Sequence, residues 1–231
     1  GETITRDSIQ FEIIEANAGI SVGPDGATHQ ALEDMAIMRV IPNMVVLAPA
    51  DVHEARKATL AAAEYDGPVY LRVARAPTPV VTTPESPFTI GAAERLADRN
   101  RGHDQTVGLV VTGTLLHSAL MAARVLNTEH GIGASVLHVP TVKPLDTEAL
   151  DAFAKEHGRL VTIEEHQRYG GLGSAVCEYL AEHRPTRVAR VGMDDQFGQS
   201  GEPDELLAHY GFDAAGVVAT TRAFVAATSA Q

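Results

Sequence analysis

The chain has 231 residues, of which 45% are hydrophobic and 5% aromatic, and its formal net charge is −12. This composition is that of a folded protein with one large core or two smaller ones, because disordered chains contain fewer apolar residues. The acidic charge argues against binding to nucleic acid or to anionic membranes, both of which attract clustered Lys and Arg. We therefore expect neither partner.

Strand and helix signals alternate from residue 9 to residue 75. Asp51 and Glu54 form a capping pair at the start of one of the helices. The β-rich runs and the helical patterns predict strands at 9–14, 44–50 and 67–75, and helices at 27–40 and 54–65. This order predicts a parallel sheet covered by helices. With about three strands, the first unit resembles half a domain.

A proline-rich stretch interrupts the alternation, with four prolines in residues 76–87. It predicts a linker, which we place at 81–104 between a first unit (1–80) and a second unit (105–231). The second unit is predicted to contain strands at 105–113, 133–140, 159–165 and 187–193, and helices at 115–130, 145–158, 171–183, 205–212 and 213–228. The expected fold class is α/β, with two units of mostly parallel sheet and covering helices.

Cys177 is the sole cysteine, which excludes an intrachain disulfide and a thiolate metal site. Its apolar surroundings favour a buried structural thiol. No apolar run reaches the roughly 18 residues of a membrane span, and no signal peptide opens the chain. We therefore expect a cytoplasmic protein.

The densest polar segment is SVGPDGATHQALED, residues 21–34. A Gly-rich loop leads here into a predicted helix, with Asp25, His29 and Gln30 at or before its first turn. Helix N-termini offer free N–H groups and positive potential to polar ligands. The pattern alone leaves two interpretations open: a ligand site, or a helix cap beside a surface histidine.

Residues 23–51, GPDGATHQALEDMAIMRVIPNMVVLAPAD, resemble the pyrimidine-binding domain of the transketolase family. That family has G-x-D-G-x-T-H-Q, then L/M-R-x-I-P-N-M and P-A-D. GPVYLRVAR resembles its next strand, and VKPLD, TIEEH, GGLGS and DDQFGQSG resemble its C-terminal domain. The resemblance covers essentially the whole chain. It implies a partial pyrimidine-binding domain over 1–80 and a transketolase C-terminal domain over 105–231.

The form ALEDMAIMR is most similar to split transketolases, in which one polypeptide carries the diphosphate-binding domain and another carries the rest. Deoxyxylulose-phosphate synthases usually have D-G-P-T-H-H where this chain has DGATHQ. Beta subunits of 2-oxo-acid dehydrogenases share the architecture but usually have H-S-Q in the loop. The resemblance therefore favours the C-terminal subunit of a split transketolase.

The resemblance implies three substrate-facing side chains in the first unit. His29 matches a catalytic histidine that hydrogen-bonds the substrate and assists proton transfer, which suits an imidazole. Asp25 matches an aspartate that binds a sugar hydroxyl. Arg75 matches an arginine whose planar guanidinium binds the sugar phosphate. Arg72 falls on the other face of the strand and is expected to be structural.

Asn17 departs from the family pattern. The family usually has a histidine there, as in T-H-A-G or T-H-D-S, which helps to bind phosphate. Asparagine donates a hydrogen bond but brings no charge. We keep Asn17 among the substrate-binding residues and expect weaker phosphate recognition, so that the acceptor is unphosphorylated or presents its anionic group differently.

Thiamine diphosphate and Mg (or Ca) are the cofactors that the resemblance implies. The family glutamate that protonates the aminopyrimidine has no counterpart in residues 1–16, and the metal loop G-D-G…Asn belongs to another domain. No metal site is predicted in this chain, and its cofactor-binding residues are unknown. We therefore expect an N-terminal transketolase subunit, or an upstream segment, to hold the cofactor in a homodimer or heterotetramer.

Two later segments are expected to be structural in such a protein. GGLGS (170–174) opens a helix and is able to cradle phosphate, but it lacks the full dinucleotide fingerprint, and packing is favoured. EEH (164–166) ends a strand, and its side chains are expected at domain or dimer contacts. His103, His117, His130 and His183 are expected to be ordinary surface histidines.

The sequence leads to one main functional hypothesis and two alternatives. The main one is the C-terminal component of a thiamine-diphosphate-dependent, transketolase-like transferase. It would move a two-carbon ketol unit from a ketose to a sugar or small aldehyde, together with a partner. The alternatives are a non-catalytic assembly or regulatory module of the same fold, and a beta-type subunit of a 2-oxo-acid dehydrogenase-like complex.

Overall fold

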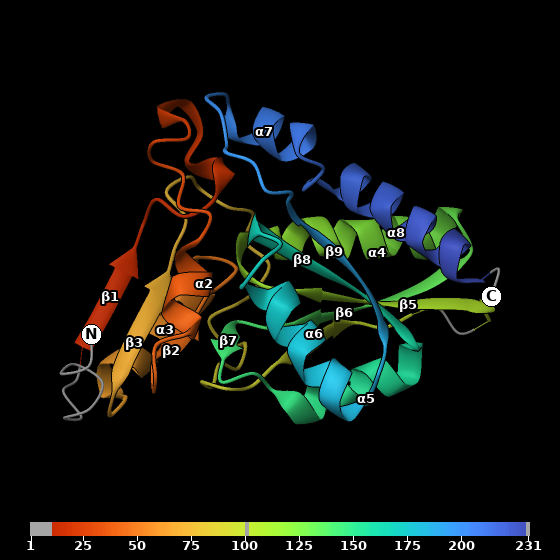
Figure 1. The fold of residues 1–231 in the computed structure, drawn as a ribbon, viewed down its shortest axis with the longest axis horizontal. Coiled ribbons are helices and arrows are strands. Elements are labelled where there is room, and N and C mark those ends of the chain that lie inside the picture. The colour runs from red at the N-terminus through yellow and green to blue at the C-terminus, as the bar shows by residue number, and fades with distance from the viewer. Residues whose placement is uncertain (1–10, 100–101, 230–231) are drawn as a thin grey trace.

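A computed structural model describes residues 11–99 and 102–229 (Figure 1). Its strands are β1 Phe11–Glu15, β2 Val45–Leu47, β3 Pro68–Arg72, β4 Glu94–Ala97, β5 Gln105–Val111, β6 Ile132–His138, β7 Thr141–Lys143, β8 Arg159–Gln167 and β9 Arg187–Met193. Its helices are α2 Asp34–Arg39, α3 Val52–Glu64, α4 Leu116–Glu129, α5 Thr147–His157, α6 Leu172–His183, α7 Pro203–His209 and α8 Ala214–Ser229, with 3-10 turns η1 Ile20–Asp25 and η2 Gly113–Leu115. The first two residues of the strand predicted at 9–14 lie outside the described ranges.

The first sheet has the strand order β1-β3-β2-β7. Strands β1, β3 and β2 are parallel, with Val45 opposite Val69, and β7 joins them antiparallel from the second half of the chain. The apolar strand β2 is buried, and one of its faces packs on the small residues Ala58 and Ala62 of α3. Asp51 caps this helix, since its Oδ1 accepts the N–H groups of two residues in the first turn.

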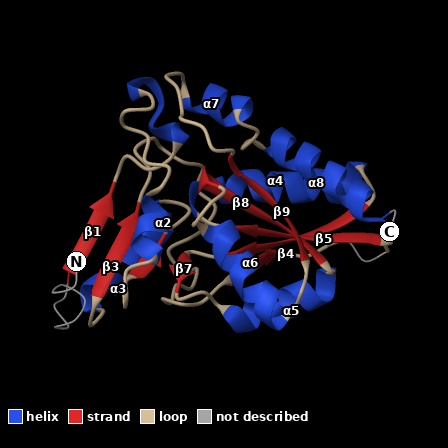
Figure 2. Cartoon of the chain, in the orientation of Figure 1, coloured by secondary structure: helices blue, strands red, loops and turns tan. Residues whose placement is uncertain are grey.

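The second sheet has the order β4-β6-β5-β8-β9, and all of its pairs are parallel except β4 with β6. Helices α4 and α8 cover one face, and α5 and α6 cover the other (Figure 2). The core under α5 and α6 also includes Met35, Val46 and Tyr70 of the first unit. The two units therefore share apolar packing, and the α/β fold class with mostly parallel sheets is confirmed.

Three local predictions differ from the structure. The helix predicted from residue 27 begins only at Asp34. The backbone carbonyls before it accept hydrogen bonds from other segments, since Gly19 N–H donates to Ala31 O and Gln167 N–H donates to Leu32 O, both at 2.8 Å. Strand β4 lies inside the stretch predicted as a linker, and β7 has no counterpart among the predicted strands. The unit boundaries at 80 and 105 stay a prediction.

A helix that crosses a bilayer must be both long and predominantly apolar. Across the described residues, no helix combines the length and the apolar character that this requires. The longest apolar helix, α8, instead packs on α4 and on the second sheet.

Candidate functional site

The polar loop between β1 and α2 is closed at its base by backbone pairing. Ala18 and Ala31 form an isolated parallel bridge, and Ala31 N–H donates to Asn17 O at 3.0 Å. Between these points the chain forms η1 and a turn in which His29 N–H donates to Gly26 O at 3.0 Å. In Figure 1 the loop lies beside α7, at the top of the molecule. Residues 17–31, here called the substrate loop, therefore form a compact unit.

The substrate loop brings the predicted side chains into one exposed region. Arg75 reaches across from the end of β3 and forms an ion pair with Asp25. His29 is exposed in the same turn, and its Nδ1 lies 3.0 Å from Thr28 Oγ1. An exposed carboxylate, an imidazole and a guanidinium can together bind hydroxyls, transfer a proton and bind an anion.

Asn17 lies at the base of the substrate loop, and its side chain is exposed. Its backbone N–H donates to Glu15 Oε1 at 2.6 Å, and its carbonyl accepts from Ala31. These backbone contacts leave the amide side chain facing solvent near the start of the loop. An exposed amide can donate to a ligand there without adding charge.

A buried ion pair lies at the C-terminal base of the loop. Arg72 Nε contacts Asp34 Oδ2 at 2.7 Å, and the two side chains are only 7% and 8% exposed. Tyr70 OH donates to the same carboxylate at 2.7 Å. Burial raises the pKa of Asp34, but the charge and hydrogen bonds of Arg72 outweigh it, so the net pKa is lowered. The expectation that Arg72 is structural agrees with this geometry.

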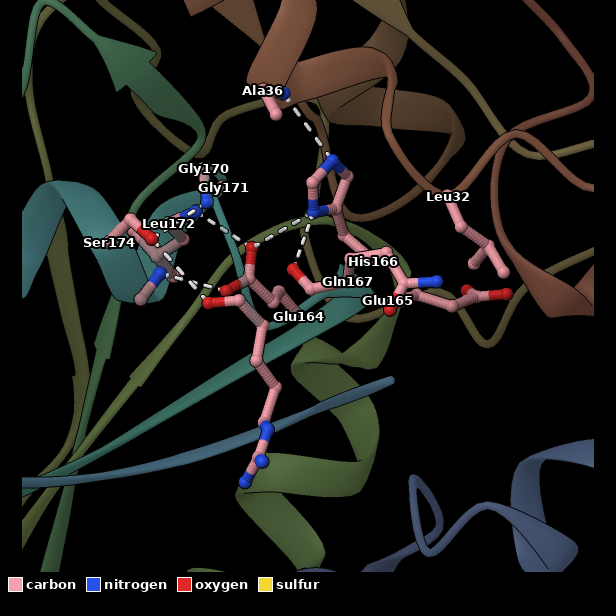
Figure 3. Close-up of polar contacts among 12 residues, drawn as sticks. Leu32, Ala36, Glu164, Glu165, His166, Gln167, Gly170, Gly171, Leu172 and Ser174 are labelled. Atoms are coloured by element: carbon pink, nitrogen blue, oxygen red, sulfur yellow. Dashed lines mark hydrogen bonds and ion pairs between the residues drawn. The ribbon is translucent and has the colours of Figure 1, made fainter. Parts of the chain in front are cut away.

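The segment 164–166 connects the second unit to the first. Glu165 Oε1 accepts Ser21 N–H at 2.6 Å. His166 Nε2 accepts Ala36 N–H at 3.4 Å (Figure 3). All three side chains of the segment are buried. The expectation of domain contacts is met, but the sequence did not indicate that Glu165 would bond directly to the substrate loop.

Glu164 explains the Gly-rich turn that opens α6. Its carboxylate accepts the N–H groups of Leu172 and Gly173 at 2.7 and 2.8 Å (Figure 3). A side-chain carboxylate thus occupies the helix N-terminus where a phosphate would otherwise bind. Burial raises the pKa of Glu164 to about 7, against the lowering effect of these hydrogen bonds. The packing role predicted for GGLGS agrees with the structure.

Burial lowers the pKa of His166 to about 4. Its neutral ring donates from Nδ1 to Gln167 O at 2.7 Å and accepts at Nε2. This tautomer satisfies both ring nitrogens without a charge. His166 is therefore a neutral connector between the two units.

The cysteine and the histidines outside the substrate loop differ in how far they are exposed. Cys177 was predicted to be buried but is only half-buried, and this burial raises the pKa of its thiol. The four histidines predicted at the surface are exposed or partly exposed: His103, His117, His130 and His183. Fully buried histidines were not predicted from the sequence, and three occur among the described residues: His138, His157 and His166.

A cavity of about 520 Å³ lies between the units, next to the carboxyl ends of β5 and β8. Its walls include Ser21, Thr114 and Glu165, with apolar residues from the 76–79 segment, α4, α7 and α8. None of the four predicted substrate residues lines it. The candidate site is therefore the exposed loop surface rather than this cavity.

A divalent ion bound to a diphosphate needs several oxygen ligands close together. Within 11–99 and 102–229, no three His, Cys, Asp or Glu side chains gather as such a site. The exposed carboxylate of the substrate loop, Asp25, is engaged by Arg75. These residues therefore do not by themselves fit a metal-bound diphosphate.

The fold and the loop define an α/β protein of the transketolase type. A model of the transketolase pyrimidine-binding domain matches residues 4–80, and a model of the transketolase C-terminal domain matches residues 95–217. The chain belongs to the transketolase family, as a C-terminal component, which confirms the resemblance seen in the sequence.

Individual relatives agree with this assignment. The chain is 41% identical to a putative transketolase C-terminal section from Methanocaldococcus jannaschii, over 91% of this chain and 65% of that protein. It is 38% identical to one of the subunits of an apulose-4-phosphate transketolase from Phocaeicola vulgatus, over 93% of this chain and 67% of that relative. The chain thus spans about two thirds of the length of these relatives.

Solved structures give the same result. A split-gene transketolase, described as an inactive beta4 tetramer, superposes with a TM-score of 0.81 at 41% identity, covering 91% of this chain and 65% of that one. A transketolase from Pichia stipitis matches with a TM-score of 0.74 at 21% identity, covering 97% of this chain and 31% of that one. The second match shows the shared fold alone.

Proposed function

We propose that this chain is the C-terminal subunit of a split transketolase that transfers a two-carbon ketol unit from a ketose to an aldehyde. The observation that carries the proposal is the exposed substrate loop, which presents His29 and an Asp25 that pairs with Arg75. The split relatives support the same assignment, since the Phocaeicola vulgatus protein is one subunit of an apulose-4-phosphate transketolase.

Each side chain has a distinct task in this proposal. His29 donates to a substrate oxygen and moves a proton there, because an imidazole exchanges protons readily near neutral pH. Asp25 accepts a hydrogen bond from a sugar hydroxyl. Arg75 binds an anionic group of the substrate, which takes the place of Asp25 as its partner. Asn17 adds a neutral hydrogen bond at the edge of the site.

Thiamine diphosphate and its divalent ion would be bound by a partner polypeptide. The described residues do not fit the metal-bound diphosphate, so its ligands would come from that partner. We propose an N-terminal subunit as the partner, in a heterotetramer. A cytoplasmic location stays a prediction from the sequence.

Reconstitution tests the proposed function. The chain is mixed with a polypeptide that carries the diphosphate-binding domain, thiamine diphosphate and Mg²⁺, and ketol transfer is followed. We expect His29→Ala to lower kcat by about 10²-fold, the usual scale for a group that transfers a proton. His183→Ala, at an exposed histidine on α6, is the matched control and leaves kcat unchanged. An active complex in which His29→Ala has no effect would remove His29 from the mechanism.

A further inference from the structure

Two adjacent carboxylates at the end of β8 point in opposite directions (Figure 3). Glu164 faces the N-terminus of α6, whereas Glu165 faces the first unit. Glu165 Oε1 accepts Ser21 N–H at 2.6 Å, and its Oε2 accepts the Thr114 hydroxyl at 2.9 Å. Both oxygens are therefore used as hydrogen-bond acceptors. Glu165 joins the substrate loop to η2, the turn that precedes α4.

The substrate loop approaches Glu165 more closely than a side chain would allow. Gly19 has a φ of 82°, and a Cβ at this position would overlap Glu165 Oε1. The glutamate is only 3% exposed, so it has little room to move aside. Gly19 thus provides both the positive φ and the space that this contact needs.

A second connection ties the same loop to the second unit. Gln30 is 5% exposed, and its Nε2 donates to Ile20 O at 3.1 Å and to Gln199 O at 3.0 Å. It therefore connects the two ends of the substrate loop with the 194–201 segment. Both connections reach the loop from residues more than 140 positions away in the chain.

Local structure alone holds the loop weakly. Its central part, η1, is a six-residue 3-10 turn that contains Pro24 and a non-helical Gly23. Turns of this kind have poor hydrogen-bond geometry and do not persist in long runs. The position of Asp25 and His29 is therefore set largely by contacts from outside the loop.

We infer that Glu165 of the C-terminal unit is a positioning residue that holds the substrate loop, and with it Asp25 and His29, in place for ketol transfer. The catalytic part of this inference rests on the proposed function. The part that concerns the order of the loop is independent of the proposed function, because hydrogen exchange measures it on the chain itself. The C-terminal unit thereby contributes to the site without touching the substrate.

Hydrogen exchange measured by mass spectrometry distinguishes the effect of Glu165 on the loop from that of Glu164. Glu165→Met removes both acceptors and is expected to speed exchange of amides in residues 19–31 by about tenfold or more, since a bond to a charged acceptor is lost. Glu165→Gln keeps one acceptor for Ser21 and gives a smaller change. Glu164→Gln is the matched control, which affects amides at the start of α6 but not the loop. Unchanged loop exchange in Glu165→Met would overturn the inference.

Thr114→Val provides a milder second variant, should Glu165→Met not fold. It leaves the carboxylate in place but removes its hydroxyl partner, and we expect a smaller acceleration in the same residues. Exchange in β5 and α4 is the measure of intact folding. No acceleration in the loop of this folded variant would also count against the inference.

Kinetics in the reconstituted complex test the catalytic part. We expect Glu165→Met to lower kcat by about tenfold or more with a smaller change in KM, because a misplaced catalytic group mainly affects the reacting step. Faster loop exchange with unchanged kcat in an active complex would refute the positioning role. If the wild-type complex shows no ketol transfer, the proposed function fails, and the exchange data alone decide whether Glu165 holds the loop.

Discussion

Arg72 and Arg75 are three residues apart, yet the structure predicts a large loss of stability for removal of the first and a small one for removal of the second. Arg72 is 7% exposed and contacts Asp34 at 2.7 Å, while its Nη2 donates to Ala31 O at 3.2 Å and Glu165 O at 2.8 Å. Arg75 is half-exposed and pairs with Asp25 at the surface. The variant Arg72→Met tests this difference, with Arg75→Met as its matched control.

Removal of Arg72 leaves Asp34 buried without its cation, and the carbonyls of Ala31 and Glu165 each lose one donor. Breaking a buried pair on one side usually costs about 3–5 kcal/mol, whereas an exposed pair contributes about 0–1 kcal/mol. We therefore expect Arg72→Met to lower the free energy of unfolding by about 4 kcal/mol, and Arg75→Met by less than about 1 kcal/mol. The difference comes from desolvation, since the chemical change is the same.

Urea unfolding followed by far-UV circular dichroism measures both values. With an m-value of about 2–3 kcal/mol/M, a loss of about 4 kcal/mol moves the midpoint by about 1.5 M. The double variant Asp34→Leu with Arg72→Met should lose less than the sum of the single variants, because no charge is left buried without a partner. If Arg72→Met lies within about 1 kcal/mol of the wild type at an equal m-value, the buried pair does not have the role described here.

Three further predictions concern buried titratable groups. Burial lowers the pKa of His157 to about 4, so the folded state loses stability as pH falls from 6.5 to 4. Between pH 7 and pH 4, the free energy of unfolding measured with urea should therefore fall by about 3 kcal/mol less in His157→Phe than in the wild type. Burial raises the pKa of Glu164 to about 7, so its contribution to stability is lost as pH rises from 4.5 to 7, the direction opposite to that of His157. In Glu164→Gln the free energy of unfolding should depend less on pH across that window. A variant with the same pH dependence as the wild type would contradict this. Asp51 caps α3 and also accepts both the backbone N–H and the hydroxyl of Thr82 at 2.6 Å. Asp51→Ala should therefore lower the melting temperature by several degrees. Asp66→Ala, at an exposed turn, is the control and should leave it unchanged.

The sequence was sufficient for features that depend on local patterns. Alternating strand and helix signals predicted two α/β units, and the caps and glycines placed most helix ends within a few residues. The motif around DGATHQ located the substrate loop and its family. The contrast between Arg72 and Arg75 followed from their positions at the end of one strand.

Only the tertiary structure decided the features that depend on distant segments. The helix after the loop starts at Asp34 because the backbone before it bonds to Gln167 and Gly19, and β7 joins the first sheet from the second half of the chain. Glu165 and Gln30 hold the substrate loop through bonds to partners more than 140 residues away. Periodicity reports which face of an element is apolar, but not which distant polar group satisfies a loop's backbone. That pairing is fixed only when the two units pack together.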